Sequence, residues 1–252
     1  MDLFSHILKE RILLLDGAMG TQLQAKGLVG DSEAFNLSHP DVILGIHQAY
    51  IEAGADIIET NSFGANRLSQ EEYGRAADAR DMALAAARIA RKAADGAPRK
   101  IWVAGSVGPT GKSLTLPQRL DDPLYRPCDF DGMAEVYGEE IGALVEGGVD
   151  LILLETCFDA LNVKAALYAL GDYPGVPVII SASPADRSGR TLTGQTLEAF
   201  FHSVRHGRPV AFGLNCSLGA TDMLPLLEDV ASWCDCPVCC YPTAGLPNEM
   251  GT

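Results

Sequence analysis

The sequence predicts an α/β fold of the β/α-barrel type, and three observations carry this prediction. Short apolar runs alternate with longer helical patterns along the 252 residues, and a continuous apolar run is typical of a buried parallel strand. Polar residues stand at the C-terminal ends of several runs, where β/α barrels carry their chemistry. The length also suits one such domain, because these barrels have about 250 residues.

Seven strands are expected, and each is followed by a helix or a loop. The expected strands are residues 11–17, 55–60, 101–105, 149–155, 177–182, 210–216 and 237–241. The expected helices are residues 38–53, 68–95, 133–146, 160–170, 197–206 and 223–233. Because a closed barrel needs eight strands, we expect residues 1–252 to form a single domain that lacks the eighth strand.

Composition limits the classes of partner and the compartment. The net charge of -14 and the pI near 4.7 argue against nucleic acid or an anionic membrane surface as partner. No N-terminal segment resembles a signal peptide, and no apolar run approaches the roughly 18 residues of a membrane span. Seven cysteines without an export signal favour reduced thiols. A cytoplasmic enzyme is therefore expected.

The apolar run of residues 210–216 ends in Asn215 and Cys216, and the chain then breaks at Ser217 and Gly219. In an alternating strand–helix fold this pattern places a thiol at the C-terminal end of a buried parallel strand, which is the functional edge of such folds. The alternative is a structural cysteine, because free cysteine is among the most buried residue types.

Three carboxylates end three different expected strands. Asp16, Glu59 and Glu155 occupy these positions, and Asn61 follows Glu59 closely. Any one of them could be a helix cap or an ordinary loop charge. Together, on one edge and beside a cysteine, they predict a site for a ligand with an ammonium group, such as an amino acid.

Residues 106–113 are similar to a phosphate-binding loop, but Ser106 stands where that pattern requires glycine. The segment that follows is also a poor helix start, so nucleotide hydrolysis is disfavoured. Histidines on or beside the expected helices are interpreted as surface residues: His39, His47, His202 and His206.

Four cysteines crowd near the C-terminal end of the sequence: Cys234, Cys236, Cys239 and Cys240. The spacing of Cys236 and Cys239 could indicate a redox pair or half of a zinc site. However, neighbouring side chains of a strand point to opposite faces, and no second pair of matching spacing is present. Free thiols are the preferred interpretation.

Six segments of the chain carry a resemblance to a known family. They are residues 15–23, 35–40, 53–66, 106–111, 154–156 and 213–216. In this order they resemble the homocysteine S-methyltransferase family, and within it the homocysteine-binding domains of the cobalamin-dependent methionine synthase type. The resemblance covers nearly the whole chain. It implies a (βα)8 TIM barrel that transfers a methyl group to the homocysteine thiolate and so forms methionine.

The resemblance implies a Zn²⁺ ion that three cysteine thiolates hold. Cys216 matches the first of these ligands, whereas the other two belong to a Gly-Gly-Cys-Cys-Gly segment that this sequence lacks. Cys239 and Cys240 precede the turn at residues 241–245 and do not match that pair. We therefore expect a C-terminally incomplete domain that binds zinc weakly and is inactive alone.

The resemblance also implies a role for the strand-end residues. Asp16 with the Gly17 backbone, and Glu155, would orient the amino acid end of homocysteine, while Glu59, Asn61 and Asn215 complete the expected substrate-binding set. The implied donor is methylcobalamin, recharged by 5-methyltetrahydrofolate on folate- and cobalamin-binding modules of the same or a partner chain. Two alternatives stay open: a methyltransferase that uses betaine or S-methylmethionine, and a non-catalytic barrel fragment.

Overall fold

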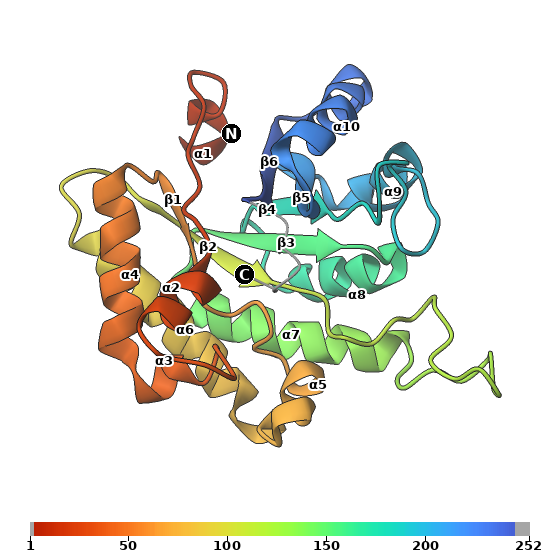
Figure 1. Ribbon diagram of the computed structural model, residues 1–252, viewed down its shortest axis with the longest axis horizontal. Helices are drawn as coiled ribbons and strands as arrows, with labels where there is room; N and C mark the ends of the chain where they lie inside the picture. Colours follow the sequence, from red (N-terminus) through yellow and green to blue (C-terminus); the bar gives the residue numbers. More distant parts are fainter. Residues whose placement is uncertain (1–2, 245–252) are drawn as a thin grey trace.

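The computed structural model describes residues 3–244 (Figure 1). Its strands are β1 (Ile57–Glu59), β2 (Trp102–Val107), β3 (Leu151–Cys157), β4 (Val178–Ala182), β5 (Ala211–Gly219) and β6 (Val238–Thr243). Its α-helices are α1 (Leu3–Ile7), α2 (Met19–Ala25), α3 (Phe35–Ser38), α4 (Pro40–Ala53), α5 (Arg67–Gln70), α6 (Ala79–Asp95), α7 (Phe130–Glu146), α8 (Ala160–Leu170), α9 (Leu197–Val204) and α10 (Ala220–Trp233). Within the described residues no helix has the length and apolar character that crossing a membrane requires.

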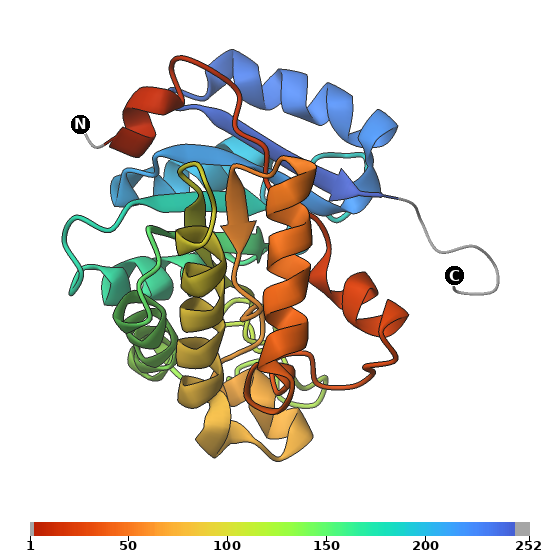
Figure 2. The same cartoon turned by 90° about the vertical axis from the view of Figure 1, so that its left-hand side faces the viewer.

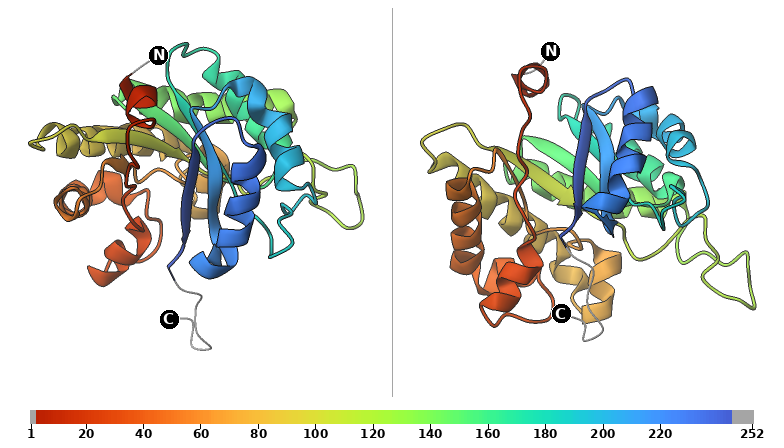
Figure 3. Two further views of the ribbon diagram at one scale, coloured as in Figure 1. Left: turned by 90° about the horizontal axis from the view of Figure 1, so that it is seen from above. Right: turned by 45° about the horizontal axis from the view of Figure 1, so that its top comes forward.

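The six described strands form one parallel sheet in the order β1-β2-β3-β4-β5-β6. The sheet curls into a half-barrel, and the long helices lie on its outer side (Figures 1 and 3). Helix α1 lies at the end of the sheet opposite to the arrowheads of β5 and β6 (Figure 2). The α/β prediction is confirmed, whereas the described residues do not establish an eight-strand count.

The expected first strand is only partly formed. Leu15 makes an isolated parallel bridge to Ile57, and the Leu14 carbonyl accepts from the N–H of Ile57 at 3.0 Å. The segment therefore lies along the free edge of β1 without becoming a regular strand. Because no described strand covers its other edge, Ile12 and Leu14 are 85% and 58% exposed.

The expected helix over residues 68–95 is wrong in its first third. Helix α5 is followed by two short 3₁₀ turns, η1 (Glu71–Tyr73) and η2 (Ala76–Asp78), before α6 begins. Gly74 adopts a left-handed conformation with φ 68°, and a residue in this conformation ends a helical segment. The alanine-rich character of the whole stretch concealed this break.

Two apolar layers hold the sheet. The outer layer packs the helices on one face of the sheet and includes Leu144, Ile152 and Phe212. The inner layer lies on the opposite face, where the ring of Phe4 in α1 contacts Trp102 edge-on at a centroid distance of 5.0 Å. Alternate side chains of a strand point to opposite faces, and this alternation assigns each strand residue to one of the two layers.

Gly213 allows β5 and β6 to approach each other closely. A Cβ atom at this position would lie 1.8 Å from the Cys239 carbonyl oxygen. Glycine is the residue that permits such a backbone approach. The pairing of Gly213 with Cys239 therefore fixes the position of β6 on the sheet.

The prediction that His47 lies at the surface is wrong. Its side chain is fully buried in α4, which packs against α6. Neither ring nitrogen has a hydrogen-bond partner among the described residues. Burial disfavours the charged imidazolium and lowers the pKa of His47 to about 4. The other helix-associated histidines, His39, His202 and His206, are exposed as expected.

Candidate functional site

The inner face of the sheet changes from apolar to polar toward the carboxyl ends of the strands. Apolar inner-layer residues occupy the early positions, among them Ile57, Trp102, Leu151, Ile179 and Ala211. Two or four positions later on the same strands stand Glu59, Ser106, Glu155, Ser181 and Asn215. A shift of two or four keeps a side chain on the same face, so these polar residues converge on one end of the half-barrel.

Asp16 joins this group from the N-terminal segment. Its carboxylate oxygens accept hydrogen bonds from the Glu59 N–H at 3.2 and 3.1 Å. The pKa of Asp16 is raised to about 8: burial is the largest cause, the hydrogen bond from the Glu59 N–H opposes it, and the nearby Glu155 carboxylate adds to it. Burial, followed by Glu155 and Asp16, likewise raises the pKa of Glu59. We call Asp16, Glu59 and Glu155 the carboxylate cluster.

Glu155 is the most enclosed member of the cluster, with 6% of its surface exposed. The Ser106 hydroxyl donates to its Oε1, and the Tyr241 hydroxyl donates to its Oε2 at 3.3 Å. Burial raises the pKa of Glu155, whereas these two hydrogen bonds favour the ionised form and lower it. Glu155 is therefore held in one orientation by side chains from β2 and β6.

Asn215 connects the ends of β3, β4 and β5. Its amide oxygen accepts from the Thr156 N–H at 3.0 Å and the Ser181 hydroxyl at 2.7 Å. Its amide nitrogen donates to the Thr156 hydroxyl at 2.9 Å and the Cys216 sulfur at 3.1 Å. The Asn215 side chain is fully buried, so it builds the site wall and positions its neighbours.

Three non-glycine residues at these strand ends have positive φ: Thr156 at 55°, Cys216 at 56° and Ser217 at 59°. The strand register shifts at both places. Such backbone strain clusters at functional sites, because the surrounding structure must over-determine it. The strain turns the Cys216 side chain to an exposed position, and Cys216 contributes to the raised pKa of Glu59.

Asp16, Glu59, Glu155 and Cys216 thus lie close together. In addition to burial, Glu155 raises the pKa of Asp16, and Glu155, Asp16 and Cys216 all raise the pKa of Glu59. Gly17 lies beside them, and a Cβ there would lie 2.8 Å from the Tyr50 hydroxyl. The Asn61 side chain is turned to other partners: its amide nitrogen donates to the Ser32 carbonyl at 2.7 Å and to the Asn36 side-chain oxygen at 3.1 Å.

Some residues of the site were missed in the sequence, chiefly Ser106, Thr156, Ser181 and Tyr241. A usable signal existed for Ser106 and Ser181. Both lie an even number of residues after an inward apolar residue of the same strand, as Glu155 does. Thr156 lies at a bulge, where the alternation of faces is interrupted. Tyr241 required the knowledge that β6 pairs with β5 at Asn215.

The described residues do not fit a zinc site of three thiolates. No group of three or more His, Cys, Asp or Glu side chains between residues 3 and 244 has the geometry of a metal site. Cys216 contributes a single exposed thiol. Burial raises the pKa of the Cys239 thiol, and the Cys240 sulfur lies 3.4 Å from the Met223 sulfur. That Cys239 and Cys240 are not the matching ligands stays a prediction.

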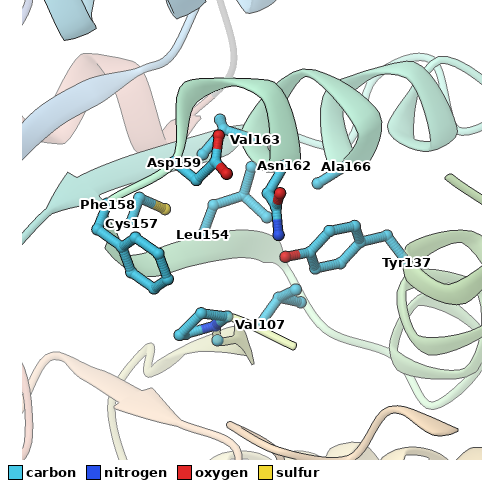
Figure 4. A pocket seen from close by; sticks show the side chains of 11 residues that line it. Val107, Tyr137, Leu154, Cys157, Phe158, Asp159, Asn162, Val163 and Ala166 are labelled. Atoms are coloured by element: carbon cyan, nitrogen blue, oxygen red, sulfur yellow. The ribbon is translucent and has the colours of Figure 1, made fainter. Parts of the chain in front are cut away.

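A small, mainly apolar pocket lies elsewhere, between the outer face of the sheet and helices α7 and α8 (Figure 4). Its carboxylate is already hydrogen-bonded within the protein, and its thiol is held in the neutral form. The Asp159 carboxylate caps α8 and accepts from Thr115 at 2.7 and 3.0 Å, and burial raises the pKa of the Cys157 thiol. We interpret this pocket as packing space beside the core.

Residues 106–113 do not form a phosphate-binding loop. After β2 the chain runs without an α-helix to α7, which begins at Phe130. The Ser106 hydroxyl is engaged with Glu155. A helix N-terminus that could hold a phosphate is therefore not present in this segment.

A curled parallel sheet with its polar cluster at the carboxyl ends of the strands is the architecture of β/α-barrel enzymes. Residues 13–252 match the family described as homocysteine S-methyltransferase, and the chain belongs to this family. The resemblance seen in the sequence is confirmed.

Three solved structures of the homocysteine methyltransferase MmuM from Escherichia coli share the fold. The metallated form is 24% identical with a TM-score of 0.81, and the match covers 96% of this chain and 87% of that one. The oxidized form is 25% identical with a TM-score of 0.84, covering 97% and 87%. The apo form is 26% identical with a TM-score of 0.76, covering 95% and 85%.

Proposed function

We propose that this chain binds homocysteine at the carboxylate cluster and serves the transfer of a methyl group to its sulfur, giving methionine. The carrying observation is the convergence of Asp16, Glu59 and Glu155 with Cys216 at one end of the half-barrel. Family membership supports methylation of homocysteine. The residue roles below are part of the proposal.

The carboxylate cluster suits the ammonium group of the substrate. Burial is the main reason that the pKa values of Asp16 and Glu59 are raised, and repulsion among the three carboxyls adds to it when they are ionised. An ammonium group placed among them would relieve this repulsion and favour the ionised forms. Ser106 and Tyr241 hold Glu155 in place, so the ammonium group meets an oriented acceptor.

The sulfur end of the substrate is assigned to the neighbourhood of Cys216. A free thiol has a pKa of about 8.5, and only its thiolate is a strong nucleophile. We propose that Cys216 is one ligand of a zinc site, and that Zn²⁺ would stabilise the substrate thiolate. Because the described residues contain no group of three or more ligating side chains that could hold a metal, residues 1–252 are expected to bind zinc weakly and to be inactive unless zinc is supplied in excess.

The donor belongs to the same proposal. We favour methylcobalamin, with folate- and cobalamin-binding modules as partners, because the six resembling segments are most similar to the methionine synthase type. Betaine and S-methylmethionine are the competing donors.

The proposal includes a reducing, cytoplasmic setting, and the seven cysteines with free thiols support it. The second candidate function is a non-catalytic homocysteine-binding module. It is favoured because the described residues contain no group of three or more side chains that could hold a metal ion.

The test follows isotopically labelled homocysteine into methionine in the presence of excess Zn²⁺. Methylcobalamin, betaine and S-methylmethionine are supplied separately, and labelled methionine is measured by mass spectrometry. We expect slow formation with methylcobalamin, lost in Cys216→Ser and kept in Cys240→Ser, whose thiol is also exposed. More product with another donor would refute the donor assignment. Equal product from Cys216→Ser would refute the role of that thiol, and binding without product would support the non-catalytic module.

A further inference from the structure

Two cysteines lie together in the loop that joins α10 to β6. Cys234 is the C-cap residue of α10, with its N–H bonded to the Val230 carbonyl, and Cys236 stands two residues before β6. Their sulfur atoms are 3.4 Å apart. Both side chains are partly exposed, so the two thiols are in contact with each other and within reach of small molecules.

The surroundings of this pair combine an aromatic ring with charged side chains. Cys236 lines a surface hollow together with Phe201, Arg205, Arg208 and Asp235. Arg205 pairs with Asp235 at 2.6 Å and lies over the Phe201 ring. With Arg205 paired to Asp235, Arg208 leaves the hollow with one net positive charge, which favours the approach of a small anionic reagent.

The pair belongs to the outer side of the sheet, away from the carboxylate cluster. Cys234 and Cys236 pack against the outer core layer, whereas Glu59 and Glu155 extend from the inner face. Chemistry at this pair is therefore separable from substrate binding.

We propose that Cys234 and Cys236 form a redox-active dithiol, which small anionic disulfides convert to an intrachain disulfide. One protein thiolate attacks a sulfur of the reagent and releases one small thiolate. The second protein thiolate then attacks the mixed disulfide and releases the other small thiolate. The protein loses two hydrogen atoms and gains one S–S bond, and the reagent is reduced to two thiols.

The raised pKa of Cys236 slows oxidation of the pair at neutral pH. Burial, followed by the contact with Cys234, raises the pKa of Cys236 to about 12. Because only thiolates attack disulfides, oxidation is slow at pH 7 and accelerates as the pH rises. A small ring with one intervening residue is also easily reduced again, as is typical of strained regulatory disulfides.

The first test uses phenylarsine oxide, which condenses with two adjacent thiols and releases one water molecule. A chelating pair holds such a reagent about 10²–10⁴-fold more tightly than a single thiol. We expect that loss of affinity in Cys234→Ser and in Cys236→Ser, with Cys240→Ser unchanged. The Trp233 indole, near Phe201, provides a fluorescence check that the variants are folded.

The second test treats the reduced chain with glutathione disulfide at pH 7 and pH 9. Free thiols are blocked with one alkylating reagent, and thiols released by reduction are labelled with another. We expect the second label on Cys234 and Cys236, more at pH 9. Second label confined to other cysteines, or arsenical affinity equal in both serine variants and the unmodified chain, would overturn the proposal.

Discussion

At the scale of single residues, burial acts on acids and bases in opposite directions. It raises the pKa of Asp16 to about 8 and lowers that of His47 to about 4, because both shifts favour the neutral form. Asp16 has charged neighbours that a ligand could exploit. His47 has no hydrogen-bond partner among the described residues. We therefore assign Asp16 to the site and treat His47 as a cost to stability.

Asp16 makes ligand binding depend on pH. The folded protein holds a proton on Asp16 below about pH 8, and an ammonium ligand must displace that proton. The affinity for 2-aminobutyrate, which lacks the thiol, should therefore fall by up to about tenfold per pH unit below pH 8. Calorimetry should show this slope reduced by about one proton in Asp16→Asn and unchanged in the surface control Asp41→Asn. An unchanged slope in Asp16→Asn would contradict the assignment.

His47→Leu should stabilise the fold. The buried imidazole has unsatisfied nitrogens, and removing such groups is worth about 1–3 kcal/mol. The lowered pKa means that the unfolded state binds a proton between pH 6.5 and about 4 while the folded state does not. Stability is therefore lost as the pH falls through this window, and the variant should lose less of it.

Urea unfolding at pH 7 and pH 4.5 measures both effects of His47→Leu. His202→Leu, at an exposed position of α9, is the control and should change little. A His47→Leu protein that is less stable than the unmodified chain at both pH values would show that the imidazole has a partner role.

At the scale of secondary-structure elements, apolar runs predicted the strands well. Helix α8 begins and ends where its periodicity predicts, and β3 and β4 agree within two residues. The prediction was wrong where a tertiary fact decided the outcome. Residues 11–17 need a second neighbouring strand to become regular, and Gly74 interrupts a segment with high helix propensity.

Gly213→Ala should weaken the pairing of β5 with β6. The added Cβ would meet the Cys239 carbonyl, and overpacking of this kind costs about 1–3 kcal/mol and occasionally more. Gly45→Ala in α4 is the matched control, because no atom lies within 4 Å of its Cβ. Alanine should there stabilise the helix by about 0.5–1 kcal/mol. Thermal unfolding of both variants measures the difference, and equal melting temperatures would contradict the close approach.

At the scale of the whole molecule, the two faces of the curled sheet have different roles. The outer face packs on the helices, and the inner face ends in the carboxylate cluster. The convergence of Asp16, Glu59 and Glu155 followed from the rule that parallel strands end at one edge. The hydrogen bonds of Asn61 to Ser32 and Asn36 could not be predicted from this rule, because they depend on the path of a loop. The supporting contacts of Glu155 depend on strand register, which a sequence alone does not specify.

The central claim is that the carboxylate cluster holds the ammonium group of homocysteine. The most direct test is isothermal calorimetry with homocysteine and with 4-mercaptobutyrate, which is the same molecule without its amino group. We predict that 4-mercaptobutyrate binds at least about tenfold more weakly, a difference of roughly 1.4 kcal/mol. Equal affinities for the two ligands would contradict the account.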